Sequence, residues 1–144
     1  MAEPLMNQEQ IKQIIPHRDP FLLIDEVVEM EIGKRIVATK QIKADDFWFK
    51  GHFPEYPVVP GVLMLEMLAQ AGAVAMLSME EHKGKIGFLA GINDAKFRRQ
   101  VVPGDTLTLE VEIIKVKGPI GVGKALATVD GQKAVSAEIS FALK

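Results

Sequence analysis

The chain has 144 residues, of which 48% are hydrophobic and 25% charged, a composition typical of one globular domain that would span residues 1–144. Its formal net charge of −2 argues against binding of nucleic acid, because phosphate neutralisation requires concentrated Lys and Arg. It contains no cysteine, which excludes disulfides and thiolate zinc sites and fits a reducing compartment.

The first residues, MAEPLMNQEQ, lack the basic start and the long apolar segment of a secretory signal, so we expect a cytoplasmic protein. The one candidate for a membrane span is residues 62–77. This run falls short of the roughly 20 apolar residues that a span needs, and it contains Glu66 and Gln70. We therefore expect a buried helix and no membrane insertion.

The first forty residues predict a short helix and two strands. Asn7 is the expected N-cap of a helix that continues to Ile14. Prolines bracket a turn over residues 16–20, which we interpret as a lid on one end of the domain. Mostly apolar residues at 21–30 and 34–43 then predict two strands joined by a tight turn.

Residues 51–77 are the most unusual stretch, in which the loop GHFPEYPVVPG leads into VLMLEMLAQAGAVAML. Proline at every third position from Pro54 to Pro60 prevents both helix and strand, so a helix should begin near Pro60. Apolar or small side chains then point in every direction, as expected of an enclosed helix. We expect the helix to end near residues 82–84, where a glycine follows.

The second half of the sequence changes to the alternating pattern of strands. The alternation reverses near Ile113, which predicts a β-bulge, and Asp130-Gly131 predicts a tight hairpin turn. About six strands joined mostly by hairpin turns, with one long helix, indicate an α+β fold in which an antiparallel sheet wraps around the helix. The expected strands of this half are 86–98, one after the turn at 103–105, 122–129 and one after the Asp130-Gly131 turn that alternates over 135–143.

Glu66 is the single carboxylate in the apolar helix, and an ionised carboxylate is costly to bury. It should hold a proton or find hydrogen bonds, and a protonated buried carboxyl is a useful acid catalyst. His52 precedes it in the proline-rich loop and suits general-base chemistry. Spacing alone also allows a histidine that only closes a turn and a glutamate that pairs with an arginine in an interface.

Two neighbours of Glu66 carry a functional and a structural interpretation each. Gln70 lies one turn later on the same helical face, where it can orient the carboxyl of Glu66 or only satisfy backbone groups. Gly61, at the start of the helix, offers backbone N–H groups to a developing oxyanion. Alternatively, glycine is present there only so that the chain can turn.

Two other motifs are rejected. Residues 118–124, GPIGVGK, nearly match a phosphate-binding loop, but Ala125 lacks the required hydroxyl and the following residues alternate as a strand. We expect a hairpin connection instead. No metal site is expected, because His17, His52 and His82 are far apart in the sequence and no acidic cluster at ligand spacing accompanies them.

The densest basic cluster consists of Lys96, Arg98 and Arg99. One interpretation is a solvated strand end. The other is docking of an acidic partner, which a local positive patch can steer even in a chain of negative net charge.

Three motifs give the sequence a resemblance that covers nearly all of it. They are PHRDPFLLID at 16–25, GHFPEYPVVPGVLMLEMLAQAG at 51–72 and GINDAKFRRQVVPGD at 91–105. In them the chain resembles the (3R)-hydroxyacyl-[acyl carrier protein] dehydratases of bacterial fatty acid synthesis. The resemblance implies a hotdog fold, homodimers joined edge to edge, assembly of three dimers into a hexamer, and no cofactor.

The resemblance also implies the site. His52 of one subunit would remove a proton from C2 of the acyl thioester, and Glu66 of the other would protonate the departing C3 hydroxyl. The N–H of Gly61 would polarise the thioester carbonyl. A partner, acyl carrier protein with its phosphopantetheine-linked acyl chain, would dock on the basic cluster. The acyl tunnel would be lined by Phe53, Pro60, Val62 and Phe88.

Some alternatives remain open at this stage. Glu66 stands where the related dehydratase/isomerases have Asp, which favours simple dehydration to a trans-2-enoyl product for membrane lipids, for lipid A biosynthesis, or for both. Some relatives have a bulky aromatic gate near Gly87, so chain-length preference is open. A hotdog thioesterase and a non-catalytic acyl-binding module are the competing functions.

Overall fold

The computed structural model describes residues 4–144. Residues 1–3 belong to the stretch in which we looked for a secretory signal, and they lie outside the described residues. The elements in chain order are α1 (Gln8–Ile11), β1 (Glu26–Glu31), β2 (Arg35–Gln41), η1 (Phe47–Lys50), α2 (Gly61–Leu77), η2 (Glu80–His82), β3 (Gly87–Phe97), β4 (Thr106–Lys117), β5 (Ile120–Val129) and β6 (Gln132–Leu143).

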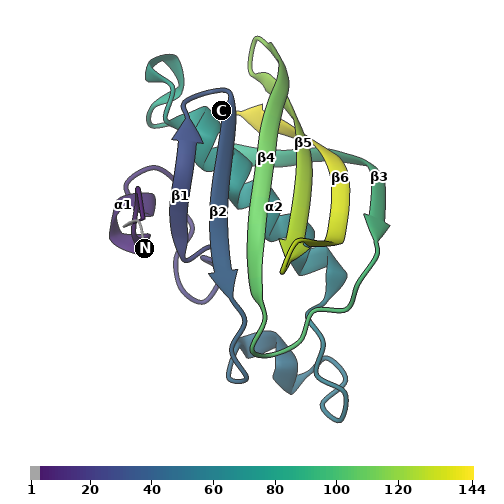
Figure 1. Cartoon of the computed structure of the whole chain (residues 1–144). Coiled ribbons are helices and arrows are strands. Elements are labelled where there is room, and N and C mark those ends of the chain that lie inside the picture. The colour runs from purple at the N-terminus through teal and green to yellow at the C-terminus, as the bar shows by residue number, and fades with distance from the viewer. Residues whose placement is uncertain (1–3) are drawn as a thin grey trace.

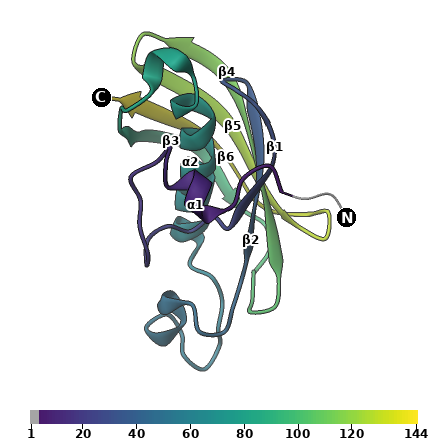
Figure 2. The ribbon, with the colours of Figure 1, turned by 90° about the vertical axis from the view of Figure 1, so that its left-hand side faces the viewer.

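The six strands form one antiparallel sheet in the order β1-β2-β4-β5-β6-β3. The sheet curves around α2, which crosses behind the strands in Figure 1 and lies on one side of the sheet in Figure 2. The predicted α+β fold, an antiparallel sheet of six strands wrapped around one long helix, is confirmed. Strands β1 and β3 are the two edges of this sheet.

The central helix α2 is enclosed over most of its length, as predicted, since thirteen of its seventeen residues are buried, but its first turn is open and Val62 is 70% exposed. It begins directly after Pro60, as expected, but it ends at Leu77 rather than near residues 82–84. Ser78 donates its hydroxyl back to the carbonyl of Val74 at 2.7 Å, and Met79 takes an extended backbone conformation. The residues expected to continue the helix therefore form the separate turn η2.

Small residues allow other elements to approach α2 closely. A Cβ atom at Gly72 would overlap the ring of Phe141 on β6, and a Cβ atom at Gly121 on β5 would lie 2.6 Å from Cε of Met76. Both Gly72 and Gly121 thus let large side chains fill the space between helix and sheet, which native packing density requires.

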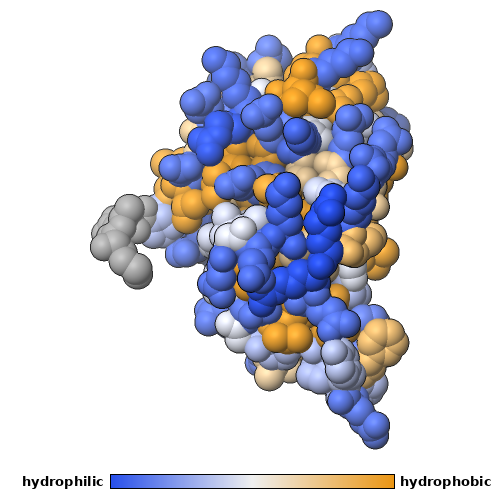
Figure 3. Space-filling view, turned by 45° about the vertical axis from the view of Figure 1, so that its right-hand side comes forward, coloured by the Kyte–Doolittle hydropathy of each residue, from blue (hydrophilic) through white to orange (hydrophobic). Residues whose placement is uncertain are grey.

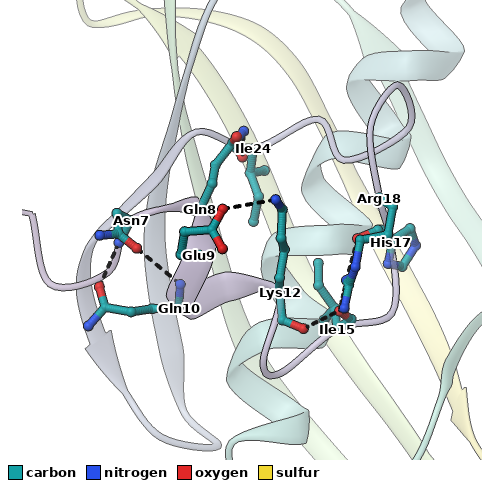
Figure 4. A network of polar contacts seen from close by, with 9 residues as sticks. All are labelled: Asn7, Gln8, Glu9, Gln10, Lys12, Ile15, His17, Arg18 and Ile24. Atoms are coloured by element: carbon teal, nitrogen blue, oxygen red, sulfur yellow. Dashed lines mark hydrogen bonds and ion pairs between the residues drawn. The ribbon is translucent and has the colours of Figure 1, made fainter.

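The N-terminal helix α1 has the predicted cap. Asn7 accepts a hydrogen bond from the N–H of Gln10 at 3.0 Å, and Gln10 accepts one from the N–H of Asn7 at 2.9 Å, which is a capping box. Figure 4 shows this pair and the loop that follows. The helix ends at Ile11 instead of Ile14, because the next turn tightens, with the N–H of Ile14 bonded to the carbonyl of Ile11.

The first strand is shorter than predicted, because β1 begins at Glu26 rather than at residue 21. Backbone groups of Phe21, Leu23 and Ile24 bond to side chains of the two helices instead of to a neighbouring strand. The residues that we expected to start the strand therefore form a connection between β1 and the helices.

The hairpin predictions in the second half are confirmed. The register of β4 and β5 shifts between Ile113 and Lys115, at the predicted bulge. Asp130 and Gly131 both have positive φ, as their tight turn requires. Strand β5 begins at Ile120, two residues earlier than predicted. In a phosphate-binding loop a helix would begin near Lys124, but here the strand continues through this residue.

Within residues 4–144, no helix is both long enough and apolar enough to cross a membrane.

The close approach at Gly72 gives a stability prediction. Gly72→Val should lower the free energy of unfolding by about 2 kcal/mol, because the added carbons would overlap the buried ring of Phe141. Gly51→Val is the matched control, since a Cβ atom at Gly51 would meet nothing within 4 Å. Urea unfolding followed by circular dichroism measures both, and equal midpoints for the two variants would contradict this account of the packing.

Candidate active site

The loop that carries His52 is held by short contacts of its own. The backbone N–H of His52 donates to the carbonyl of Trp48 in η1 at 3.0 Å. The ring atom Nδ1 lies 3.0 Å from the carbonyl oxygen of Val58. Since a carbonyl oxygen only accepts, Nδ1 carries the proton and Nε2 keeps its lone pair. His52 is thus held in the tautomer that can accept a proton at Nε2.

A buried lysine anchors this loop to the sheet. Lys40, on β2, is only 8% exposed, and its Nζ lies 3.6 Å from carboxylate oxygens of both Asp25 and Asp46. The same Nζ lies 5.9 Å from the centre of the Trp48 ring. Asp46 precedes η1, so the ion pairs of Lys40 fix the segment from which the His52 loop starts.

Gly61 begins α2, and a Cβ atom there would lie 2.6 Å from Cε1 of Phe97. The first N–H groups of a helix have no acceptor within it, and among residues 4–144 those of Gly61 and Val62 have none elsewhere. Both interpretations of Gly61 therefore have structural support. A side chain at this position would displace the half-exposed ring of Phe97, and the position presents N–H donors at the positive end of the helix dipole.

Glu66 lies on the second turn of α2 and is held by Gln70. The Nε2 of Gln70 donates to Oε2 of Glu66 at 2.9 Å, which is the hydrogen bond expected from their spacing. Gln70 also donates to the carbonyl of Phe21 at 2.8 Å and accepts the N–H of Leu23 at 2.9 Å. The two interpretations of Gln70 thus hold together, since it orients the carboxyl and satisfies backbone groups at once.

Glu66 is less enclosed than its apolar surroundings in the sequence predict. Its side chain keeps 20% of its surface exposed in the single chain, because it faces a cavity of about 220 Å³. The residues around the cavity come from α2, β3, β6 and the loop after α1, and they are His17, Phe21, Glu66, Ala69, Gln70, Gly87, Leu89 and Phe141.

The histidine beside Glu66 within the chain is His17, a residue that the sequence analysis assigned only to a turn. Its Nε2 lies 3.6 Å from Oε2 of Glu66. No hydrogen bond or ion pair among residues 4–144 joins His52 to Glu66. The predicted lid over residues 16–20 thus brings a side chain into the cavity. The signal in the sequence was a histidine fixed between two prolines.

Three of the expected tunnel residues are exposed in the single chain. Phe53, Val62 and Phe88 are 59%, 70% and 50% exposed. Gly87 lines the cavity, whereas Phe88 does not, which places the glycine and not the aromatic beside Glu66. Figure 3 shows the side of the molecule where the edge strand β3 lies, with apolar patches between charged side chains. Large exposed apolar residues of β3 are Phe88, Leu89, Ile92 and Phe97.

The basic cluster is only partly available. Nζ of Lys96 lies 3.8 Å from Asp94, and Arg99 donates to Gln132 at 2.6 Å. Arg98 is exposed, and its guanidinium has no hydrogen bond or ion pair within residues 4–144. Of the three side chains, Arg98 is the one without a contact inside the described residues, while Lys96 remains 54% exposed beside its ion pair.

Comparison with known proteins shows to which class of protein the chain belongs. The family described as the FabA-like domain matches residues 15–138. Among solved structures, the fold is similar to the dehydratase heterocomplex ApeI:P from Xenorhabdus doucetiae, with a TM-score of 0.76, 16% identity, and 100% of this chain and 93% of the other covered. A hypothetical thioesterase with coenzyme A from Streptococcus pneumoniae aligns with a TM-score of 0.66 and 15% identity over 83% of this chain and 84% of the other. At such identities these likenesses show the hotdog fold alone.

Relatives of high identity define the family within this class. The chain is 61% identical over 140 residues to the 3-hydroxyacyl-[acyl-carrier-protein] dehydratase FabZ of Oceanobacillus iheyensis, covering 97% of this chain and 100% of the relative. It is 64% identical over 142 residues to the protein of the same name from Staphylococcus aureus, covering 99% and 97%. The chain belongs to the FabZ family of 3-hydroxyacyl-[acyl-carrier-protein] dehydratases.

The contacts of Gln70 predict a large effect of its removal. Gln70→Leu should lower the free energy of unfolding by roughly 2–4 kcal/mol, because the N–H of Leu23 and the carbonyl of Phe21 would lose their partner inside the protein. Gln132→Leu is the control, since that glutamine also makes a hydrogen bond but is exposed. Thermal unfolding measures both, and a similar small effect at the two positions would show that Gln70 is not the link described here.

Proposed function

We propose that this chain is a single-domain enzyme that dehydrates (3R)-hydroxyacyl-[acyl carrier protein] to trans-2-enoyl-[acyl carrier protein] in fatty acid biosynthesis. The observation that carries the proposal is the 61–64% identity to curated dehydratases over at least 97% of the chain. The site supports it with a carboxyl fixed at the wall of a cavity and a histidine held in the tautomer of a base.

The proposed step uses the two side chains in sequence. Nε2 of His52 takes a proton from C2 of the acyl thioester, and the electron pair left at C2 forms the double bond to C3. The bond from C3 to oxygen breaks, and the leaving hydroxyl takes a proton from Glu66 and departs as water. N–H groups at the start of α2, including that of Gly61, would stabilise the negative charge that develops on the thioester oxygen.

The proposed site is shared by two chains. His52 and Glu66 do not meet within residues 4–144, and the edge strand β3 exposes large apolar side chains that water solvates poorly. We propose that two β3 strands pair, so that His52 of one chain faces Glu66 of the other, with Phe53, Pro60, Val62 and Phe88 along the acyl path. Three such dimers would form the hexamer, acting in the cytoplasm on the carrier-linked chain.

A shared site predicts complementation between two inactive variants. His52→Ala and Glu66→Gln should each lower kcat by roughly 10²–10⁴-fold, because each removes one proton-transfer group. A randomly assembled mixture of the two should recover about a quarter of wild-type activity, since half of the dimers are mixed and each mixed dimer holds one intact site. Hydration of crotonyl thioester, followed by the loss of enoyl absorbance, measures the rates.

The outcomes separate the competing functions. Full activity in either single variant would refute the assigned roles, and no recovery in the mixture would place the site within one chain. A thiol-trapping dye in the same assay detects a thioesterase, which would release free thiol. An acyl-binding module would bind the thioester and turn over none of it.

Carrier docking predicts a substrate-dependent effect at Arg98, the free member of the basic cluster. Arg98→Glu should raise KM for carrier-linked substrate about tenfold and leave the rate with a small thioester unchanged, because only the carrier presents acidic side chains to this patch. Lys117→Glu makes the same charge change at the far end of β4 and serves as the control. An equal loss with both substrates would contradict docking at Arg98.

A further inference from the structure

His17 enters the site from the loop after α1, and the proposed dehydration step assigns it no role. Its side chain is 22% exposed and lines the cavity beside Glu66, with Nε2 at 3.6 Å from Oε2 of that carboxyl. Figure 4 shows His17 next to Arg18 on this loop. The guanidinium of Arg18 is occupied by the carbonyls of Lys12, Ile15 and His17 itself.

The surroundings of the ring determine which nitrogen carries the proton. Nδ1 of His17 is buried and has no partner within residues 4–144. A proton on Nδ1 would be a buried donor without an acceptor, which costs more than an unused lone pair. The favoured tautomer therefore carries its proton on Nε2, the atom that faces Glu66.

Two N–H groups then lie near the same oxygen of Glu66. Nε2 of Gln70 donates to Oε2 at 2.9 Å, and Nε2 of His17 approaches Oε2 at 3.6 Å, an electrostatic contact longer than a hydrogen bond. Such contacts often shorten when substrate fills a site. A proton on Oε2 would face these two donors, so the proton of the carboxyl belongs on Oε1.

We propose that His17 is a positioning residue that, with Gln70, reserves Oε2 of Glu66 for N–H donors and leaves Oε1 to carry the proton given to the leaving hydroxyl. This inference rests on the proposed dehydration. Apart from Glu66, the residues that line the cavity with His17 from α2, β3 and β6 are uncharged, so the carboxyl is the one charged group that Nε2–H can meet there.

The test compares variants that remove or imitate Nε2–H. His17→Leu should lower kcat roughly tenfold or more, because the carboxyl loses its fixed orientation. His17→Gln, whose amide nitrogen can take the place of Nε2–H, should restore most of the rate.

His82→Leu is the matched control. The Nδ1 of His82 is likewise buried and has no partner within residues 4–144, but His82 lies in η2, beyond the other end of α2. It should lose stability with an unchanged kcat. A loss of kcat in His82→Leu as large as that in His17→Leu, or an unchanged kcat in His17→Leu, would overturn the proposal.

Further outcomes keep this inference separate from the proposed function. A wild-type protein without dehydration activity refutes the function. ¹⁵N NMR of labelled histidine reports the tautomer of His17 without any turnover, and a proton found on Nδ1 alone would overturn the positioning role. If His17→Gln is as inactive as His52→Ala, His17 transfers a proton itself and the assignment is wrong. Should His17→Leu fail to fold, the rate of His17→Gln and the NMR tautomer decide.

Discussion

The amide of Gln70 is the interaction on which the arrangement of the site depends. It is 1% exposed and joins three parts of the chain, because it bonds to the backbone of Phe21 and Leu23 and to the carboxyl of Glu66. These contacts fix which end of the amide faces Glu66, since its oxygen is taken by the N–H of Leu23. The same residue that closes the N-terminal segment over α2 therefore determines that the carboxyl meets a donor.

The packing of α2 explains why this arrangement is rigid. The helix is buried on almost every side, and glycines at the closest approaches let Phe141 and Met76 fill the space against the sheet. A carboxyl attached to so enclosed a helix can move only by its own side-chain rotations. Gln70 restrains those rotations from α2 itself, and His17 faces the same oxygen from the opposite wall of the cavity.

His52 and Glu66, the proposed base and acid, are held by separate sets of contacts. Lys40 binds the start of the His52 loop to β2, and the carbonyl of Val58 selects the tautomer of His52. Neither set of contacts includes Glu66. A division of this kind suits a site completed by two chains, in which each chain must present a finished half before the halves meet.

The sequence by itself determined the elements and the class of the fold, because hydrophobic periodicity and turn residues act locally. Enclosure of residues 62–77, the bulge near Ile113 and the turn at Asp130 follow from such patterns. The bond between Gln70 and Glu66 was also accessible, since helical spacing places them on one face. Sequence motifs in turn led to the resemblance with the dehydratases, and with it to the family.

Only the tertiary structure decided where distant segments meet. It ended α2 at Leu77, kept residues 21–24 out of β1, and left Glu66 partly exposed at a cavity instead of enclosed. It also brought His17 beside Glu66, forty-nine positions apart in the sequence. No local pattern encodes that contact, because it depends on how the loop after α1 folds back over the helix, which long-range packing and the three bonds of Gln70 determine.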